Sequence, residues 1–377
     1  MTTQAKNQVI APYAACSVQS YVENYNPNIR SEFERETLMK RNLQRMCDYI
    51  DAIFAVGANK PDVKLVCFPE FSIGGLYNTQ TTVQEVKKYQ AIPIPGPETD
   101  ILAAKAKQYG TYIAACNHEN DPAWPDNFFN TAFIINPQGK IILKYRKMNV
   151  AFGLNPHDIF DKYVNPITGT RDFFPVVDTK IGRLACFICG DLMIPEIVKA
   201  SALKGAEVVC HLNSGFAGEL PRHVLRTRAW DNTVYIVEEN WAARIISTEV
   251  LGATKIPTAV DSRGGGQAMI VDYMGNIVAE AGDKTPQLVF GMIDIMALRE
   301  TRKKFRMGVA GGDSLTRTRT EVYAPFYNKT LFPPNQVFVE GPITRINDAT
   351  VTKRRNQALK NRETFFEFYS EDDVKAV

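Results

Sequence analysis

The chain has 377 residues, of which 45% are hydrophobic and 23% charged, a composition typical of globular proteins. Its net charge of +3 is too small to indicate a nucleic acid or a membrane surface as a partner, and no apolar run approaches the roughly 20 residues of a membrane helix. Because the N-terminus lacks the apolar core of a signal peptide and the seven cysteines are irregularly spaced, we expect reduced thiols and a cytoplasmic location.

Short apolar runs alternate with segments of helical periodicity over most of the chain. We expect strands at 14–19, 63–68, 112–116, 131–135, 141–145, 184–188, 207–212, 234–238, 268–271, 277–281 and 289–293. We expect helices at about 31–56, 99–109, 195–204 and 221–231. Ser31 and Glu34 form a capping-box pattern at the start of the first helix. Strands that alternate with helices predict an α/β protein, and two expected hairpins make its sheets mixed.

Two regions lack this regular patterning. Residues 149–170 are rich in Pro, Asn and Gly and are expected to form a long loop, which in a compact domain is usually functional or mobile. Residues 301–377 are mostly polar and irregular, so we expect a C-terminal extension that lies over the domain or over a neighbouring subunit. With no internal repeat or linker, residues 10–300 are predicted to form a single domain.

The stretch from 182 to 196, which reads GRLACFICGDLMIPE, organises the rest of the prediction. Its apolar run predicts a buried strand that breaks at Cys189, and Pro195 suits the first turn of a helix. Cys189 should therefore lie on a sharp turn between a strand and a helix, near backbone N–H groups and the positive end of the helix dipole. Those features favour the thiolate form of a nucleophile.

Other interpretations of Cys189 stay open at this point. Free cysteine is among the most buried residue types, so a structural thiol is one of them. Cys186 and Cys189 also have the spacing of a redox pair, but Cys186 lies inside the expected strand, whereas redox pairs usually begin a helix. A zinc site is not indicated, because no second pair of cysteines or histidines follows at ligand spacing.

Two other expected strands also end in titratable residues. Glu70 follows the strand at 63–68, and Lys147 follows the strand at 141–145 within the run KYRK. Each also has an interpretation without a function. Glu70 could be a carboxylate in a solvated loop, and KYRK could be a solvated basic patch. Binding sites in α/β folds gather at the carboxyl ends of strands, so Glu70, Lys147 and Cys189 are candidates for one site.

Five motifs together resemble the nitrilase superfamily of carbon–nitrogen hydrolases. In chain order they are FPEF at 68–71, KYRK at 144–147, CFICGDLMIPE at 186–196, RTRAWDNTVYIVEEN at 226–240 and GGGQAMIVDYMGNIVAEAGD at 264–283. Each motif is weak alone, but the resemblance spans about residues 14–295 in the family's order. It implies a four-layer α-β-β-α sandwich in a single domain, assembly as a homo-oligomer of two or more subunits, and no metal or organic cofactor.

The resemblance also implies roles for individual residues. Glu70 matches the family's general base, Lys147 its lysine and Cys189 its nucleophile. The backbone N–H of Gly190 would join Lys147 in stabilising an oxyanion. Asn213 matches a position near the family's pocket and could instead cap the turn before Gly215. By position, Phe71 could form a pocket wall, and His211 is interpreted as a strand residue with a structural partner.

The residues around Cys189 look closest to the aliphatic amidase and formamidase branch, whose substrates are small amides. Those enzymes carry a second glutamate about two turns beyond the lysine, in a stretch that here reads NVAFGLNPHD and contains no glutamate. Asp158 or Asp161 could replace it, and we take Asp161 as the candidate. Both could equally be solvated loop carboxylates.

The predicted function is hydrolysis of a small carboxamide to an acid and ammonia through a cysteine thioester. The alternatives are a nitrilase or an N-carbamoyl hydrolase on the same scaffold, and a non-catalytic binding or filament-forming member of the family. Leu192 and Met193 stand where carbamoyl hydrolases often have arginines that hold a substrate carboxylate, which disfavours an acidic substrate bound in that way.

Overall fold

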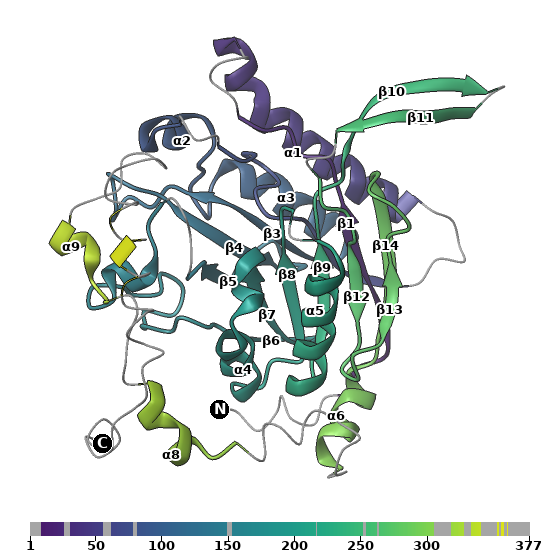
Figure 1. The fold of residues 1–377 in the computed structure, drawn as a ribbon. Coiled ribbons are helices and arrows are strands. Elements are labelled where there is room, and N and C mark those ends of the chain that lie inside the picture. The colour runs from purple at the N-terminus through teal and green to yellow at the C-terminus, as the bar shows by residue number, and fades with distance from the viewer. Residues whose placement is uncertain are drawn as a thin grey trace.

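The structure is a computed structural model in which two six-stranded sheets form the body of the protein (Figure 1). It describes residues 9–25, 31–55, 62–77, 81–148, 153–215, 217–251, 254–261, 264–304, 318–327 and 333–340, together with 353, 356, 357 and 360.

The first sheet has the strand order β14-β1-β2-β3-β4-β5. Its strands are β1 (Tyr13–Gln19), β2 (Val63–Cys67), β3 (Tyr112–Glu119), β4 (Phe129–Ile135), β5 (Ile141–Arg146) and β14 (Gln287–Ile293). β1, β2 and β3 are parallel neighbours and the remaining pairs are antiparallel. Helices α1 (Glu32–Ala55) and α3 (Pro97–Tyr109) pack on its outer face through an apolar cluster that includes Ile50 and Leu102. The short helix α2 (Val83–Tyr89) was not predicted.

The second sheet has the order β13-β12-β9-β8-β7-β6. Its strands are β6 (Val177–Thr179), β7 (Gly182–Ile188), β8 (Val208–Leu212), β9 (Tyr235–Glu239), β12 (Met269–Val271) and β13 (Ile277–Glu280). β7, β8 and β9 are parallel. The short 3-10 helix η3 (Cys189–Met193) follows β7, and α4 (Pro195–Leu203) and α5 (Glu219–Asn232) bury Val198 and Leu225 in the core beside this sheet.

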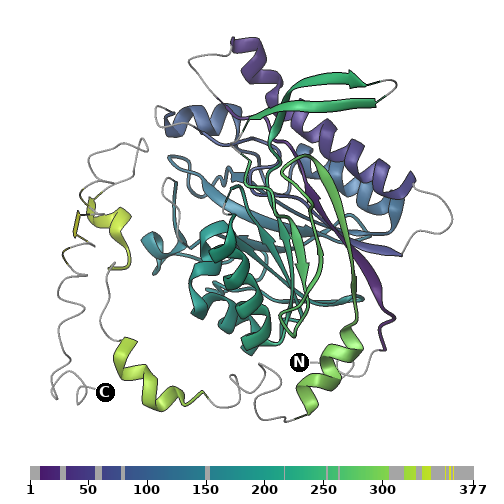
Figure 2. The same cartoon turned by 45° about the vertical axis from the view of Figure 1, so that its right-hand side comes forward.

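The inner faces of the two sheets pack against each other. The sulfurs of Cys67 on β2 and Cys210 on β8 are 3.7 Å apart, and the hydroxyl of Ser17 on β1 donates to the carbonyl of Glu238 on β9 at 2.5 Å. Figures 1 and 2 show α1 and α3 on one side of the paired sheets and α4 and α5 on the other. The predicted α/β class and four-layer α-β-β-α sandwich are confirmed.

Two further features of the fold were not predicted. A two-stranded hairpin of β10 (Arg244–Leu251) and β11 (Thr254–Asp261) projects from the body beside α1 (Figure 1). Helix α6 (Ile295–Lys303) runs across the expected end of the domain at residue 300.

The described parts of the C-terminal extension contact the body of the same chain. They contain α8 (Thr320–Tyr323), the 3-10 helix η4 (Ala324–Tyr327) and α9 (Gln336–Glu340). The hydroxyl of Tyr327 donates to Glu196 at 2.8 Å, and the backbone N–H of Asn335 donates to the carbonyl of His157 at 3.0 Å. His157 belongs to the 3-10 helix η2 (Pro156–Ile159), which lies inside the stretch predicted as a loop.

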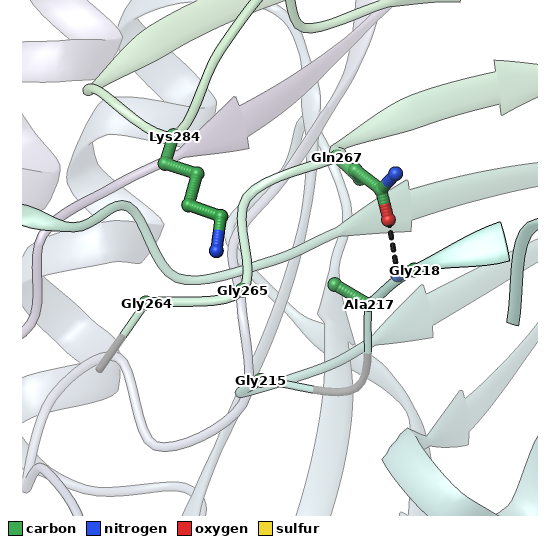
Figure 3. Close-up of a pocket in the computed structure, with 7 residues that line it drawn as sticks. All are labelled: Gly215, Ala217, Gly218, Gly264, Gly265, Gln267 and Lys284. Carbon is green, nitrogen blue, oxygen red and sulfur yellow. Dashed lines mark hydrogen bonds between the residues drawn. The ribbon is translucent and has the colours of Figure 1, made fainter. Parts of the chain in front are cut away.

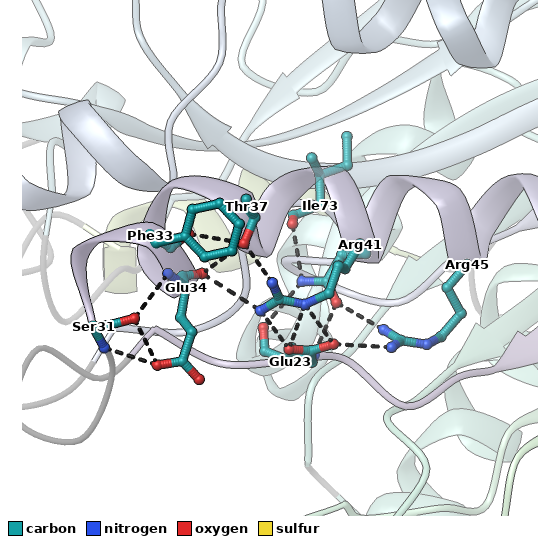
Figure 4. Close-up of polar contacts among 9 residues, drawn as sticks. Glu23, Ser31, Phe33, Glu34, Thr37, Arg41, Arg45 and Ile73 are labelled. Carbon is teal, nitrogen blue, oxygen red and sulfur yellow. Dashed lines mark hydrogen bonds and ion pairs between the residues drawn. The ribbon is translucent and has the colours of Figure 1, made fainter.

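The predicted start of α1 is confirmed in detail. The Glu34 carboxylate accepts the backbone N–H of Ser31 at 2.9 Å, and the Ser31 hydroxyl accepts the N–H of Glu34 at 3.2 Å, so the capping box is closed (Figure 4). One turn further on, Arg41 and Arg45 both bind the carboxylate of Glu23. Burial alone would raise the pKa of Glu23, but the two guanidinium groups hold that pKa at about 2.

Asn42 on α1 fixes the loop that carries Glu70. Its buried amide donates to the carbonyls of Glu23 and Ile73, both at 3.0 Å, and accepts the N–H of Glu23 at 3.0 Å. Ile73 lies three residues beyond Glu70. The helix and this strand-end loop are therefore joined through one side chain.

We expect Asn42→Ala to lower the free energy of unfolding by about 2 kcal/mol or more, because the buried backbone groups of Glu23 and Ile73 would lose their partners. Urea denaturation measures the change. Gln44→Ala is the matched control on the exposed face of the same helix and should change stability by less than about 0.5 kcal/mol. Equal effects of the two substitutions would contradict the role given to Asn42.

Candidate active site

Glu70, Lys147 and Cys189 all follow the ends of strands. Glu70 comes shortly after β2, Lys147 directly follows β5, and Cys189 directly follows β7. The ammonium of Lys147 donates to Glu70 Oε1 at 2.8 Å, and both side chains are buried. Residues 77 positions apart in the first sheet thus form one buried ion pair, and Cys189 reaches it from the second sheet.

The carboxylate of Glu70 is held from several directions. Besides Lys147, the amide of Asn130 donates to Oε1 at 2.7 Å, and the hydroxyl of Ser214 donates to Oε2 at 2.5 Å. The indole N–H of Trp241 donates to the Glu70 backbone carbonyl at 2.7 Å. A carboxylate that accepts several hydrogen bonds is fixed in orientation, which suits a general base that must meet its proton in one geometry.

The alternation of β5 explains which basic residue of KYRK reaches Glu70. Lys144 and Arg146 lie on the same face of the strand and both bind the buried carboxylate of Glu119. Lys147 lies just past the strand, where its backbone N–H is donated to the carbonyl of Asn130 at 2.9 Å and its side chain turns to Glu70. Two of the three cations therefore share Glu119, and the third binds Glu70. The run KYRK is not a solvated basic patch.

Cys189 adopts a backbone conformation that is uncommon for a side chain of its type. Its φ is +49°, and η3 begins there directly after β7. Of the seven cysteines, which are all described and free, it alone is not fully buried. A left-handed residue at the end of a buried strand turns its side chain out of the sheet, toward the space that a substrate could enter.

The electrostatic prediction for Cys189 was wrong in sign. Burial and the charge of Glu70 together raise the pKa of its thiol to about 12, although Lys147 and the N–H of Gly190 partly oppose them. The pKa of Lys147 is also shifted. Burial alone would lower it, but the charge of Glu70 holds that pKa above its ordinary value. The resting site therefore holds a neutral thiol beside a charged pair.

Asp191 lies behind the nucleophile turn and is fully buried. Its Oδ2 accepts the hydroxyl of Tyr145 at 2.7 Å and the N–H of Ile188 at 3.2 Å. Burial raises the pKa of Asp191 to about 6, although Lys147 opposes the rise. This carboxyl group ties β5 to the turn after β7 and so links the two sheets at the site.

Asn213 contacts the backbone on both sides of the site. Its side-chain oxygen accepts the N–H of Ser214 at 2.8 Å and that of Gly215 at 3.4 Å, so Asn213 caps this turn, which was the alternative to a place beside the substrate. Its backbone carbonyl accepts the N–H of Glu70 at 3.2 Å. His211, two residues earlier on β8, has the structural partner that was predicted, because its ring binds Glu238.

The two other residues predicted near the substrate, Phe71 and Gly190, differ in surroundings. Phe71 is buried and stacks on His118, with ring centroids 4.4 Å apart. Gly190 is partly exposed, and a Cβ added to it would meet no atom within 4 Å. The space in front of Gly190 is therefore open, whereas Phe71 is enclosed by other side chains.

The structure does not bring Asp161 to this cluster. The side chain is 69% exposed, its carboxylate accepts the amide of Asn335 at 2.8 Å, and Arg171 lies 4.0 Å away. The alternative, Asp158, is buried and accepts the amide of Asn155 at 2.9 Å. Both belong to or adjoin η2, where the C-terminal extension contacts the domain. Residues 149–152 of the same stretch lie outside the described residues.

Sequence reasoning missed two of the partners of Glu70. Asn130 is a buried polar residue in the mostly apolar strand β4, and Ser214 follows Asn213 just past the end of β8. Asn130 lies on a strand that pairs with the strand before Lys147. A buried polar side chain needs a hydrogen-bond partner, so its position could have indicated a contact with the site.

A glycine-lined cavity of about 300 Å³ opens beside the Ser214 end of the site (Figure 3). It is lined by Gly215, Ala217, Gly218, Gly264, Gly265, Gln267 and Lys284. Gly215 directly follows Ser214, so the cavity begins one residue from a group that contacts the Glu70 carboxylate. No group of three or more His, Cys, Asp or Glu side chains suited to a metal ion occurs among the residues that the structure describes.

Residues 26–303 match the carbon–nitrogen hydrolase family, which is about three quarters of the chain. The chain belongs to this family, within the nitrilase superfamily. Curated relatives in two bacteria are formamidases. The chain is 34% identical over 203 residues to that of Bacillus thuringiensis (strain Al Hakam), covering 53% of this chain and 56% of the relative. It is 34% identical over 197 residues to that of Bacillus cereus (strain AH820), covering 51% and 54%. The match spans about half the length of these relatives.

Solved structures of the superfamily share the fold. Nit3 of Saccharomyces cerevisiae superposes with a TM-score of 0.58 at 23% identity, covering 80% of this chain and 97% of that one. The amidase of Nesterenkonia sp. AN1 in complex with acrylamide gives a TM-score of 0.54 at 16% identity, covering 83% and 96%. Among the described residues, no helix combines the length and apolar character needed to cross a membrane.

We expect alkylation of Cys189 by iodoacetamide to accelerate about tenfold per pH unit between pH 7 and 9, because a thiol with a pKa of about 12 gains thiolate across that range. Glu70→Gln should alkylate faster than the wild type at pH 8, since removing the carboxylate charge lowers the pKa of the thiol. Mass spectrometry of the labelled peptide measures both rates. A rate that is level above pH 7, or a slower reaction of Glu70→Gln, would contradict this description of the site.

Proposed function

We propose that this carbon–nitrogen hydrolase is an amidase that cleaves small carboxamides to an acid and ammonia through a thioester on Cys189. The single observation that carries the proposal is the 2.8 Å contact between Lys147 and Glu70, buried beside a thiol on a left-handed turn. It supplies a base, a cation and a nucleophile, which are the three groups that acyl transfer from an amide requires.

In the first half of the proposed reaction, Glu70 takes the proton of Cys189 as the sulfur attacks the amide carbon. Proton removal at the moment of attack suits a thiol whose pKa is raised to about 12, because little free thiolate exists beforehand. Lys147 and the N–H of Gly190 would stabilise the negative charge that develops on the amide oxygen.

In the second half, the protonated Glu70 gives its proton to the leaving nitrogen, and ammonia departs. Water then attacks the thioester, with Glu70 as base again, and releases the acid and the free thiol. Asn130 and Ser214 hold the carboxylate of Glu70 in one orientation through both halves. Lys147 enters the reaction as an ammonium, because the charge of Glu70 holds its pKa above the ordinary value in the resting site.

The relatives support an amide as the substrate class. The curated relatives are named formamidases, and one solved structure of the Nesterenkonia amidase contains acrylamide. In another, a glutamine mutant of the same amidase carries an acetamide group, derived from fluoroacetamide, on its active-site cysteine. A nitrile or a carbamoyl compound is the alternative on the same scaffold.

We expect ammonia release from at least one of formamide, acetamide, propionamide and acrylamide, with loss of more than about 1,000-fold in kcat for Cys189→Ala and Glu70→Gln. An enzymatic ammonia assay measures the rates. The matched control is Cys47→Ala, which removes a buried thiol on α1 far along the chain from the site and should retain activity.

The products distinguish the alternatives. Ammonia with carbon dioxide would indicate a carbamoyl substrate, and ammonia from a nitrile but from no amide would indicate a nitrilase. If no amide, nitrile or carbamoyl compound gave ammonia or an adduct on Cys189, the hydrolase proposal would be wrong.

We also propose a cytoplasmic homo-oligomer in which residues 301–377 form an extension to the catalytic domain. Large apolar side chains on the outer helical layer support assembly: Met193, Leu203, Leu220 and Trp230 are between 39% and 65% exposed. Light scattering after size exclusion should give at least twice the 42.2 kDa of one chain. A monomer at micromolar concentration would refute the assembly.

A further inference from the structure

A buried histidine contacts the backbone of the nucleophile itself. His211 lies on β8 and is fully buried, and its Nε2 donates to the carbonyl oxygen of Cys189 at 2.8 Å. Its Nδ1 faces the carboxylate of Glu238 on β9, which is also buried. The imidazole therefore spans the space between the neighbouring strand and the turn after β7.

The two contacts fix where the protons of this pair lie. A carbonyl oxygen can only accept, so Nε2 carries a proton, and a further proton lies between Nδ1 and the carboxyl group of Glu238. Burial lowers the pKa of His211, but the charge and hydrogen bond of Glu238 and the Cys189 carbonyl raise it by more. A charged donor makes a stronger and better oriented hydrogen bond than a neutral one.

The carbonyl that His211 holds belongs to the same peptide unit as the N–H of Gly190. Because a trans peptide is planar, its C=O and N–H point in opposite directions, and fixing the oxygen of Cys189 fixes the direction of the Gly190 N–H. That N–H already acts on the Cys189 sulfur, since it lowers the pKa of the thiol. It is also the backbone donor that the proposed mechanism places at the oxyanion.

The turn needs such an anchor. Cys189 has a φ of +49°, a conformation that costs a non-glycine residue about 1 kcal/mol or more unless its surroundings enforce it. Among the hydrogen bonds described, the side chain that binds the carbonyl of Cys189 is that of His211. Gly190 itself has no side chain to pack, and a Cβ added to it would meet no atom within 4 Å.

The anchor extends to the base. Glu238 also accepts the amide of Asn213 at 2.8 Å through its second oxygen, and the backbone carbonyl of Asn213 accepts the N–H of Glu70. A continuous set of buried hydrogen bonds thus runs from the backbone of Cys189 through His211, Glu238 and Asn213 to the backbone of Glu70. It crosses from the second sheet to the first.

We propose that His211, held by Glu238, is a positioning residue that orients the Cys189–Gly190 peptide so that the Gly190 N–H points at the developing oxyanion. The inference rests on the proposed function. It assigns His211 no contact with the substrate and no proton transfer.

The test compares three reactions of the same site in His211→Leu. Amide hydrolysis and reversible inhibition by acetaldehyde both place a negative oxygen on the carbon that sulfur attacks, whereas alkylation by iodoacetamide does not. We expect kcat for the best amide to fall about 100-fold, with KM changed less than about threefold. The acetaldehyde inhibition constant should rise by a similar factor, and the alkylation rate should stay within about threefold of the wild type.

Two further variants complete the comparison. His211→Gln keeps a side-chain N–H that can reach the Cys189 carbonyl and should recover at least tenfold of the lost kcat, and it serves in place of His211→Leu if that variant does not fold. His223→Leu removes an exposed histidine on α5 and should leave all three reactions and the melting temperature unchanged.

The inference is overturned if folded His211→Leu keeps kcat within about twofold, or if alkylation falls by the same factor as hydrolysis, which would indicate a general structural role. Its failure can be separated from that of the proposed function. If the wild type hydrolyses no amide, the crystal structure of a His211 variant still decides the inference. We expect the Cys189–Gly190 peptide to rotate, and an unchanged peptide would refute it.

Discussion

The buried ion pair between Lys147 and Glu70 is the interaction on which the rest of the site depends. Burying two charges is costly unless each is neutralised and hydrogen-bonded, so the surroundings of the pair must be built with precision. Asn130 and Ser214 satisfy the carboxylate, and Cys189 lies beside both charges. Burial and the charge of Glu70 keep the neighbouring thiol neutral while Lys147 partly opposes them, so the packing that stabilises the fold also sets the protonation of Cys189.

The groups of the site come from both sheets. The first sheet supplies the acid and the ammonium from the ends of β2 and β5, and the second supplies the sulfur from the end of β7. The contact of Tyr145 with Asp191, and that of the Glu70 N–H with the Asn213 carbonyl, then connect the two sheets at the site. Contacts between the sheets, such as that between Cys67 and Cys210, therefore belong to the construction of the site as well as to the core.

Much of this arrangement could be predicted from the sequence, and the failures have physical reasons. Apolar runs of strand length and helical periodicity located most elements, and the positions of strand ends located Glu70, Lys147 and Cys189. The raised pKa of Cys189 could not be predicted, because burial and the nearness of Glu70 are properties of the folded chain. Asp161 was taken as the candidate because it is an acid in the expected long loop, whereas Asn335 from the distant extension holds it. The hairpin of β10 and β11 was missed because its strands pair with each other outside both main sheets.

The division of the three groups between two sheets has a consequence for how the protein loses activity. A small sliding or parting of the layers would separate the sulfur from its acid while each layer kept its own ladders and its own helices. Turnover should then disappear at a lower concentration of denaturant than the far-ultraviolet circular dichroism signal. The rate of the proposed reaction should therefore respond to a small change in the packing of the two sheets before the secondary structure does.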